Sequence, residues 1–192
     1  MKKIIIVLGL IISMVLVGCT PEQNINETGG NQTMSNTDLV VEWAPLYNSG
    51  KESVDIHSTE SQNILNETKV LAFANQETNN SVSLTTNGCL YINSDPSQDG
   101  TLFLITLLTN RTDDSIKNIH YDIKIVLNST GEVLGESAFN IPSNVYGEKI
   151  ESNKGYLAFL PFPDAPEKAT GTAYSKDEIT VQTNITYDTV ED

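Results

Sequence analysis

The sequence has very little cysteine and histidine. Among its 192 residues the only cysteines are Cys19 and Cys89, and the only histidines are His57 and His120. Structural zinc sites and redox-active dithiols need clusters such as Cys-x-x-Cys, and the chain contains none. We therefore expect no disulfide framework, no metal site and no cofactor. The stability of the fold has to come from a packed core.

Basic residues are also scarce. The chain has 11 Lys and Arg against 25 Asp and Glu, which gives a formal net charge of −14. Such a charge repels nucleic acid, anionic lipid and anionic wall polymers. Nucleic-acid binding is therefore excluded. The acidic residues are typical of a solvated surface, although they also suit a cation or a basic partner.

No apolar run is long enough to cross a membrane as a helix. The longest, Ile4 to Val17, has 14 residues, whereas a spanning helix needs about 20. It directly follows the positively charged start Met1-Lys2-Lys3. A short positive stretch followed by a short apolar segment is typical of an export signal and not of a folded domain.

The end of this apolar run resembles the lipobox of bacterial lipoproteins. In Leu16-Val17-Gly18-Cys19 a small residue precedes the cysteine. The resemblance implies that residues 1–18 are removed as a signal peptide and that a diacylglyceryl group is attached to Cys19. Two acyl chains give stable anchoring, because each buried methylene contributes about 0.8 kcal/mol. We expect a lipid anchor on the extracytoplasmic face of the cell membrane. The alternative is an ordinary secretory signal with a chance cysteine.

A polar segment follows the cysteine. Thr20 to Asp38 contains only Ile25 and Met34 as apolar residues, too few to bury a core. Residues 19–38 are therefore expected to be the lipidated cysteine and a flexible linker. The linker's typical reach is about 25 Å, from 5–6 Å × √19. Residues 39–192 are then expected to form one domain. Without Lys2 and Lys3 the mature charge is 9 − 25 = −16.

Alternating apolar and polar residues dominate this domain. Ile119 to Leu127 and Ile179 to Tyr187 follow a period of two, which predicts half-buried antiparallel strands with one wet face. Leu102 to Leu108 is apolar on both faces and predicts a central strand. Further strands are expected at Val70 to Phe73 and at Gly155 to Phe162.

Turn residues separate these segments. Asn87-Gly88 predicts a tight hairpin, and Asn128 to Gly131 predicts a second one. Asp95 to Gly100 is a third turn cluster. Only Glu60 to Glu67 is expected to form a short turn of helix. Many short strands with turns between them predict an all-β, antiparallel β-sandwich.

A second resemblance concerns the order of motifs within residues 101–162. A strand ends in Thr109-Asn110, a polar turn passes through Asp113-Asp114, a hairpin contains Gly131, and an aromatic strand begins at Tyr156. This order resembles the immunoglobulin-like modules of bacterial surface lipoproteins, such as the SLAP and FxLYD families, over about a third of the chain. The Trp-rich ending of a SLAP module is absent, since Trp43 is the only tryptophan. The resemblance implies a surface interaction or assembly domain.

Catalytic signatures are missing from the sequence. It contains no GxSxG, P-loop or HExxH motif. His120 is expected on the wet face of its strand, beside Asp122. His57 lies near Asp55 and Ser58, but neighbours in sequence do not make a catalytic triad in space. We therefore expect no catalytic residue.

A few residues are candidates for binding. Trp43, Tyr47 and Tyr156, with Phe159 nearby, either form an exposed aromatic surface or belong to the core. Cys89 is expected to be a buried packing residue, because an exposed lone thiol is a liability in an oxidising compartment.

Three functions are compatible with these observations. The first is a membrane-anchored, non-catalytic binding module whose partner is a protein or a cell-envelope polymer. The second is a cell-wall-directed hydrolase that uses carboxylates. The third is a solute-binding accessory protein of a transporter, although such receptors usually need two α/β lobes. An exposed aromatic sheet face favours the first function, and a cleft with two carboxylates favours the second.

Overall fold

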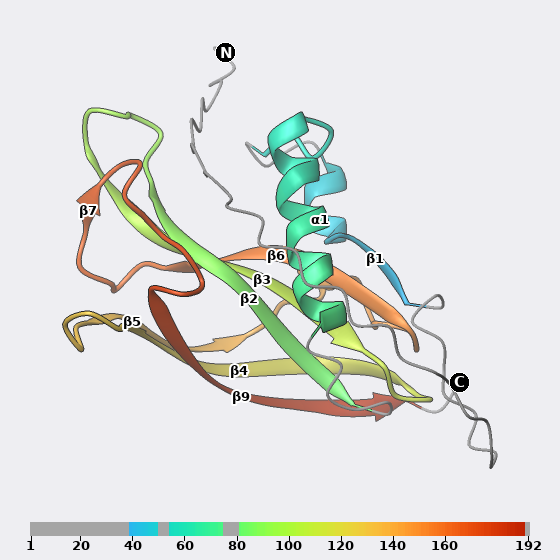
Figure 1. The fold of residues 1–192 in the computed structure, drawn as a ribbon. Helices are drawn as coiled ribbons and strands as arrows, with labels where there is room; N and C mark the ends of the chain where they lie inside the picture. The colour runs from blue at the N-terminus through green and yellow to red at the C-terminus, as the bar shows by residue number, and fades with distance from the viewer. Residues whose placement is uncertain (1–38, 50–53, 75–80, 191–192) are drawn as a thin grey trace, which may run out of the picture.

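The computed structural model describes residues 39–49, 54–74 and 81–190 (Figure 1). The expected signal peptide, Cys19 and the linker up to residue 38 lie outside these residues. The elements, in chain order, are β1 (Val40–Trp43), η1 (Pro45–Ser49), α1 (Thr59–Ala74), β2 (Val82–Ile92), β3 (Asp99–Asn110), β4 (Ser115–Leu127), β5 (Val133–Asn140), α2 (Ser143–Tyr146), β6 (Lys154–Phe162), β7 (Lys168–Ala169), β8 (Ala173–Tyr174) and β9 (Ile179–Val190).

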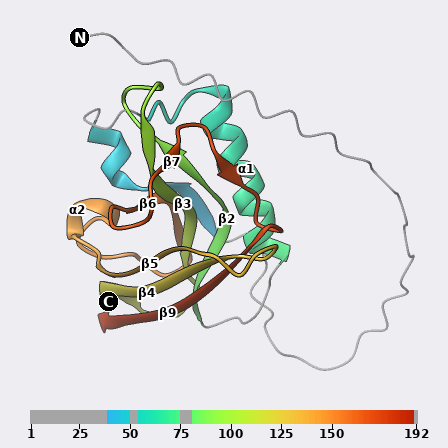
Figure 2. The same cartoon turned by 90° about the vertical axis from the view of Figure 1, so that its left-hand side faces the viewer.

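The strands form two sheets that pack face to face (Figures 1 and 2). The larger sheet has the order β1-β6-β3-β2-β8, with β7 added to β3, and the smaller sheet has the order β5-β4-β9. All neighbours are antiparallel except β1 and β6. The prediction of an all-β sandwich is confirmed.

The strands with the clearest sequence patterns occur where they are expected. β3 is central, between β2 and β6, and its leucines are buried while Phe103 and Ile105 are half-buried. On β4, buried Tyr121, Ile123 and Ile125 alternate with the more exposed Asp122 and Lys124. The predicted wet face of this strand is therefore confirmed.

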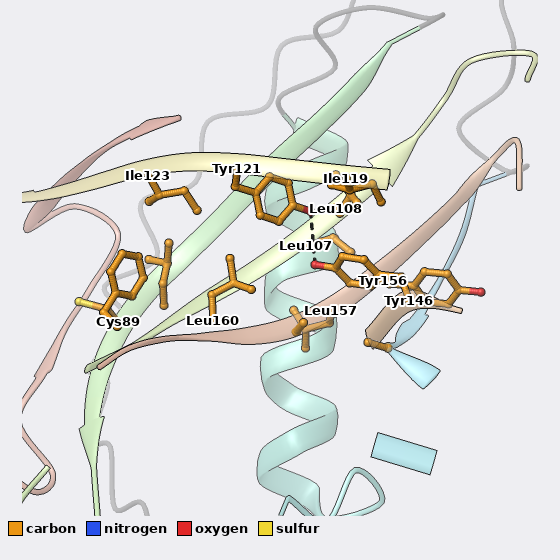
Figure 3. Close-up of a cluster of buried hydrophobic side chains, with 14 of the residues drawn as sticks. Cys89, Leu107, Leu108, Ile119, Tyr121, Ile123, Tyr146, Tyr156, Leu157 and Leu160 are labelled. Carbon is orange, nitrogen blue, oxygen red and sulfur yellow. Dashed lines mark hydrogen bonds between the residues drawn. The ribbon is translucent and has the colours of Figure 1, made fainter. Parts of the chain in front are cut away.

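The main core lies between the two sheets (Figure 3). Tyr121 and Ile123 of β4 point toward the leucines of the larger sheet, among them Leu160. The Tyr121 hydroxyl donates a hydrogen bond to the Tyr146 hydroxyl at 3.4 Å, and the Tyr146 ring stacks on Tyr156 with centroids 6.1 Å apart. Each fully buried Leu or Ile side chain contributes about 1.5–3 kcal/mol relative to an exposed one.

The helix expected at Glu60 to Glu67 is present but longer than expected, and the prediction of a strand at Val70 to Phe73 was wrong. Residues 59–74 form the 16-residue helix α1, and the expected strand Val70 to Phe73 is part of its last turn. The helix begins after Ser58, whose Oγ accepts a hydrogen bond from the Ser61 N–H at 3.1 Å. Its buried stripe includes the polar residues Ser61 and Thr68 together with Ala72. A stripe with so few apolar residues conceals the helical period.

Asn87-Gly88 also differs from its prediction. It lies inside β2, where the pairing register with β3 shifts between Thr86 and Cys89, so it forms a bulge and not a hairpin. Gly88 has φ +82, and a Cβ on it would lie 2.5 Å from the Tyr174 carbonyl oxygen. The left-handed backbone that favours an Asn-Gly turn equally favours a bulge.

The other two predicted turns are confirmed. The segment that contains Asp95 joins β2 to β3, and the Asp95 carboxylate accepts a hydrogen bond from the Ser97 N–H at 3.0 Å. Between β4 and β5 the Gly131 N–H donates to the Leu127 carbonyl at 2.8 Å. Gly131 has φ +74 there, which favours glycine.

Candidate functional site

The two sheets differ in what covers their outer faces. α1 and η1 lie on the outer side of the larger sheet, whereas no described segment covers the outer side of β5-β4-β9 (Figures 1 and 2). We call this uncovered surface the polar face and take it as the candidate site. Its residues come from three rows of the strand register: Asn140, His120 and Thr186; Ala138, Asp122 and Asn184; and Glu136, Lys124 and Gln182.

The register connects four side chains across the three strands. His120 Nδ1 lies 2.8 Å from Asn140 Oδ1 of β5, and His120 Nε2 lies 3.2 Å from Asp122 Oδ1 of the same strand. From β9, the Asn184 amide donates to Asp122 Oδ2 at 3.2 Å. Because alternate residues share a sheet face, the period of two places these groups side by side.

Hydrogen bonds shift the pKa of both ionisable groups in this network. The acceptor oxygen of Asn140, followed by that of Asp122, raises the pKa of His120 above 6.5. The Asn184 amide, followed by His120, lowers the pKa of Asp122 below 3.8. Nearby, Lys124 Nζ lies 2.9 Å from Glu136 Oε2. The charges are thus paired, and the polar face offers mainly hydrogen-bonding groups.

Two hollows of the described residues are candidates for binding. One is a shallow depression of about 430 Å³ on the polar face, between Lys124, Glu136 and Asn184. The other, of about 260 Å³, lies at one end of the sandwich beside α2 and is lined by Asn118 and Tyr146 among others. A site that encloses a small molecule usually has about 300–1,000 Å³ and buries most of its ligand. The shallow depression is better suited to contact with an extended partner.

The aromatic candidates require a correction, because Trp43, Tyr47 and Tyr156 are only 4, 7 and 7 % exposed and form no exposed patch. Trp43 packs edge-on against Tyr47 and Phe159, with centroids 5.2 and 5.4 Å away. The Tyr47 hydroxyl accepts a hydrogen bond from the Phe159 N–H at 3.0 Å. The β1–β6 pairing and η1 bring these rings together on the larger sheet. Tyr156 packs separately, on Tyr146 in the main core.

Cys89 is buried, as expected, with 2 % exposure. Burial, followed by the negative charge of Glu178, raises the pKa of its thiol to about 12. At neutral pH the nucleophilic thiolate is therefore almost absent. Cys89 is a packing residue in this structure.

The residues around His57 do not converge on a site. The His57 N–H donates to the Asp55 carboxylate at 3.0 Å, which is a local turn contact. The Ser58 hydroxyl is occupied at the start of α1. Within the described part of the chain there is also no group of three or more His, Cys, Asp or Glu placed to hold a metal ion.

The network of the polar face was missed by the sequence analysis. His120 and Asp122 were recognised as surface residues of one strand, but their partners Asn140 and Asn184 are distant in the sequence. Only the strand register, which fixes His120 opposite Asn140 and Asp122 opposite Asn184, brings the four together. The alternation of residues in each strand shows which face a side chain occupies, but not its neighbour across strands.

Comparisons with known proteins gave no match, whether with family models, curated proteins or solved structures. Among the described helices none is long and apolar enough to span a membrane.

Proposed function

We propose that this protein is an extracytoplasmic lipoprotein that displays a non-catalytic, immunoglobulin-like β-sandwich for binding. Residues 1–18 are removed, and lipid on Cys19 holds the chain on the outer face of the cell membrane. The Leu16-Val17-Gly18-Cys19 pattern supports this anchor. Between Cys19 and Leu39, the first described residue, lie 19 residues. A segment of this length is short enough to keep the domain close to the membrane.

The polar face is the proposed binding surface. The observation that carries this proposal is the asymmetry of the fold, in which one outer sheet face is covered by helices and the other is left to solvent (Figure 2). The chain enters the domain through β1, which belongs to the larger sheet. The lipid anchor is therefore attached to the sheet that does not carry the polar face. Amide, hydroxyl and paired charged groups suit a polar protein surface or a cell-envelope polymer that is recognised by hydrogen bonds.

The hydrolase function has less support. The two carboxylates of the polar face are already engaged, Asp122 by His120 and Asn184 and Glu136 by Lys124. A glycoside hydrolase needs one carboxyl group with a raised pKa and a cleft between the two carboxyl groups. The pKa of Asp122 is instead lowered, and the depression beside it is shallow.

Photo-crosslinking in intact cells tests the binding surface. A photoreactive amino acid replaces Ala138, an exposed residue of the polar face, and in a matched control it replaces Val70 of α1, which is 66 % exposed. We expect a protein or wall-polymer adduct from position 138 and none from position 70. Equal labelling at both positions, or none at position 138, would contradict the proposal.

Cell fractionation tests the anchor. Cys19→Ala is expected to release the protein from the membrane or to leave it unprocessed, because the lipid has no other attachment site. Cys89→Ala is the matched control and should fractionate with the membrane as the wild type does. Full membrane association and normal processing of the Cys19→Ala protein would contradict the anchor.

A further inference from the structure

One edge of the smaller sheet is formed by a long strand, β9, and the other by β5. β9 has 12 residues and pairs with β4 along its length. No other described strand pairs with it. The outward N–H and C=O groups of such an edge are a template for pairing with another chain. The other edge strands are shorter: β1 has four residues, β8 has two and β5 has eight.

β9 itself carries few of the usual protections of an edge strand, and the one bulge in its pairing lies on β4, between Lys117 and His120. Proteins usually block free edges with lysine, proline, bulges or very short strands. The sequence Ile-Thr-Val-Gln-Thr-Asn-Ile-Thr-Tyr-Asp-Thr-Val of residues 179–190 has no Lys, Arg, Pro or Gly, and its only charged residue is Asp188. In a chain with a net charge of −14, this edge is a nearly neutral strip that a second acidic chain can approach.

The inward side of β9 is incompletely buried. Ile179 is buried, but Val181, Ile185 and Tyr187 remain half-buried at the margin of the core. These side chains are partly exposed because the sheet ends at this strand. A further strand would cover their outer sides, since neighbours across a strand pair contact one another.

We propose that β9 pairs with β9 of a second copy of this chain to form a two-fold symmetric dimer. Antiparallel pairing about a two-fold axis perpendicular to the sheet joins the two three-stranded sheets into one. In an antiparallel pair, residues that lie directly opposite each other point to the same face of the sheet. The two-fold axis therefore passes between the two copies of one residue. An axis at Asn184 uses nearly the full strand and places Val181 opposite Tyr187 and Thr183 opposite Ile185.

The charges and the symmetry favour a second copy as the partner. With the axis at Asn184, Asp188 lies opposite Thr180 of the second copy, so no carboxylates face each other. The pairing is isologous and closed, because it consumes the β9 edge in both copies and leaves only β5 at the ends of the joined sheet. β5 carries the charged residue Glu136, which disfavours further growth. The inference concerns assembly and does not rest on the lipid anchor or the polar-face ligand.

Thiol cross-linking of the full-length chain in cells tests the interface. Asn184→Cys places two cysteines at the two-fold axis, where opposite Cβ atoms are about 4.5–5.5 Å apart, within reach of a short bismaleimide. Ser129→Cys, in the exposed β4–β5 turn, is the control, and the wild type reports any contribution of Cys19 and Cys89. We expect a dimer adduct only with Asn184→Cys. No adduct, or equal yields from both variants, would overturn the proposal.

A charge at the edge provides the second arm. Thr183 is exposed, so Thr183→Lys should leave the monomer folded while placing a lysine against Ile185 of the other copy. Added to Asn184→Cys, it should lower the yield of dimer adduct about tenfold, and Ser129→Lys should not. Folding is checked in both proteins by the protection of Cys89 from maleimide. An unchanged yield with Thr183→Lys in a folded protein would show that the copies do not pair through β9.

Discussion

Asn110 is the polar residue whose loss should damage this fold most. It is fully buried at the end of β3. Its amide nitrogen donates to the carbonyl oxygens of Asp114, Ile150 and Glu151 at 2.9, 3.1 and 3.2 Å. Its amide oxygen accepts from Thr112 N and Thr112 Oγ1 at 3.1 and 2.7 Å. One side chain thus joins the β3–β4 turn to the segment before β6.

The cost of Asn110→Ala follows from these contacts. Two of the three carbonyl oxygens keep another donor, from Thr112 Oγ1 and from the Ile116 N–H. The Thr112 N–H loses its acceptor, and the Glu151 carbonyl loses the Asn110 donor. An orphaned buried group costs about 1–3 kcal/mol and a lost hydrogen bond about 0.5–1.5 kcal/mol. We expect the free energy of unfolding to fall by about 2–4 kcal/mol.

Thermal and urea unfolding of a 39–192 fragment measure this loss. For a domain of this size about 1 kcal/mol corresponds to 2–4 °C in Tm, so Asn110→Ala should lower Tm by roughly 5–15 °C. Asn110→Asp should be at least as damaging at neutral pH, because a carboxylate would face three carbonyl oxygens. Asn144→Ala, exposed on α2, should change stability by less than about 0.5 kcal/mol. A stable Asn110→Asp protein would refute the reasoning.

Three further predictions concern the domain, its thiol and its histidine. The 39–192 fragment should give a strand-dominated circular dichroism spectrum that a chelator leaves unchanged, and unfolding on chelation would contradict this. Cys89 should resist a maleimide in native protein at pH 7–9, because burial raises the pKa of its thiol to about 12, and rapid native labelling would show that the thiol is accessible. Cys89→Ala should lower the free energy of unfolding by about 1 kcal/mol. In an NMR titration His120 should have a pKa above 6.5, which Asn140→Ala lowers. Because the pKa of His120 is raised in the folded protein, its contribution to stability is present below the unfolded pKa and is lost as pH rises through the folded pKa. A His120 pKa that Asn140→Ala leaves unchanged would contradict the hydrogen-bond network.

The sequence predicted those strands whose burial follows a simple period. Examples are β3, β4, β6 and β9. In each of these strands apolar residues occupy either both faces or every second position. Only the part of helix α1 at Glu60 to Glu67 was predicted, and its full length was missed for a physical reason. Its buried positions include Thr68, which satisfies its hydroxyl through the Ile64 carbonyl at 2.7 Å and the Asn87 amide at 3.1 Å. Polar residues that are satisfied in this way leave no hydrophobic signal.

The candidate site was less predictable than the fold. Residue type suggested Trp43 and Tyr47 as binding residues, but aromatic rings suit a core as well as a surface, and the choice depends on which element covers them. Asn87-Gly88 was ambiguous in a similar way, since its backbone fits both a hairpin and a bulge. The polar face depends on pairing between strands that are distant in the sequence, such as His120 with Asn140.

The most direct test of the proposed lipid anchor is the intact mass of the protein extracted with detergent from the membranes of its native host. The proposed lipid anchor predicts a chain that begins at Cys19, lacks residues 1–18 and carries the added mass of a diacylglyceryl group on that residue. An unmodified Cys19, or a mature chain that begins at another residue, would contradict the lipid anchor and with it the proposed display of the β-sandwich at the membrane.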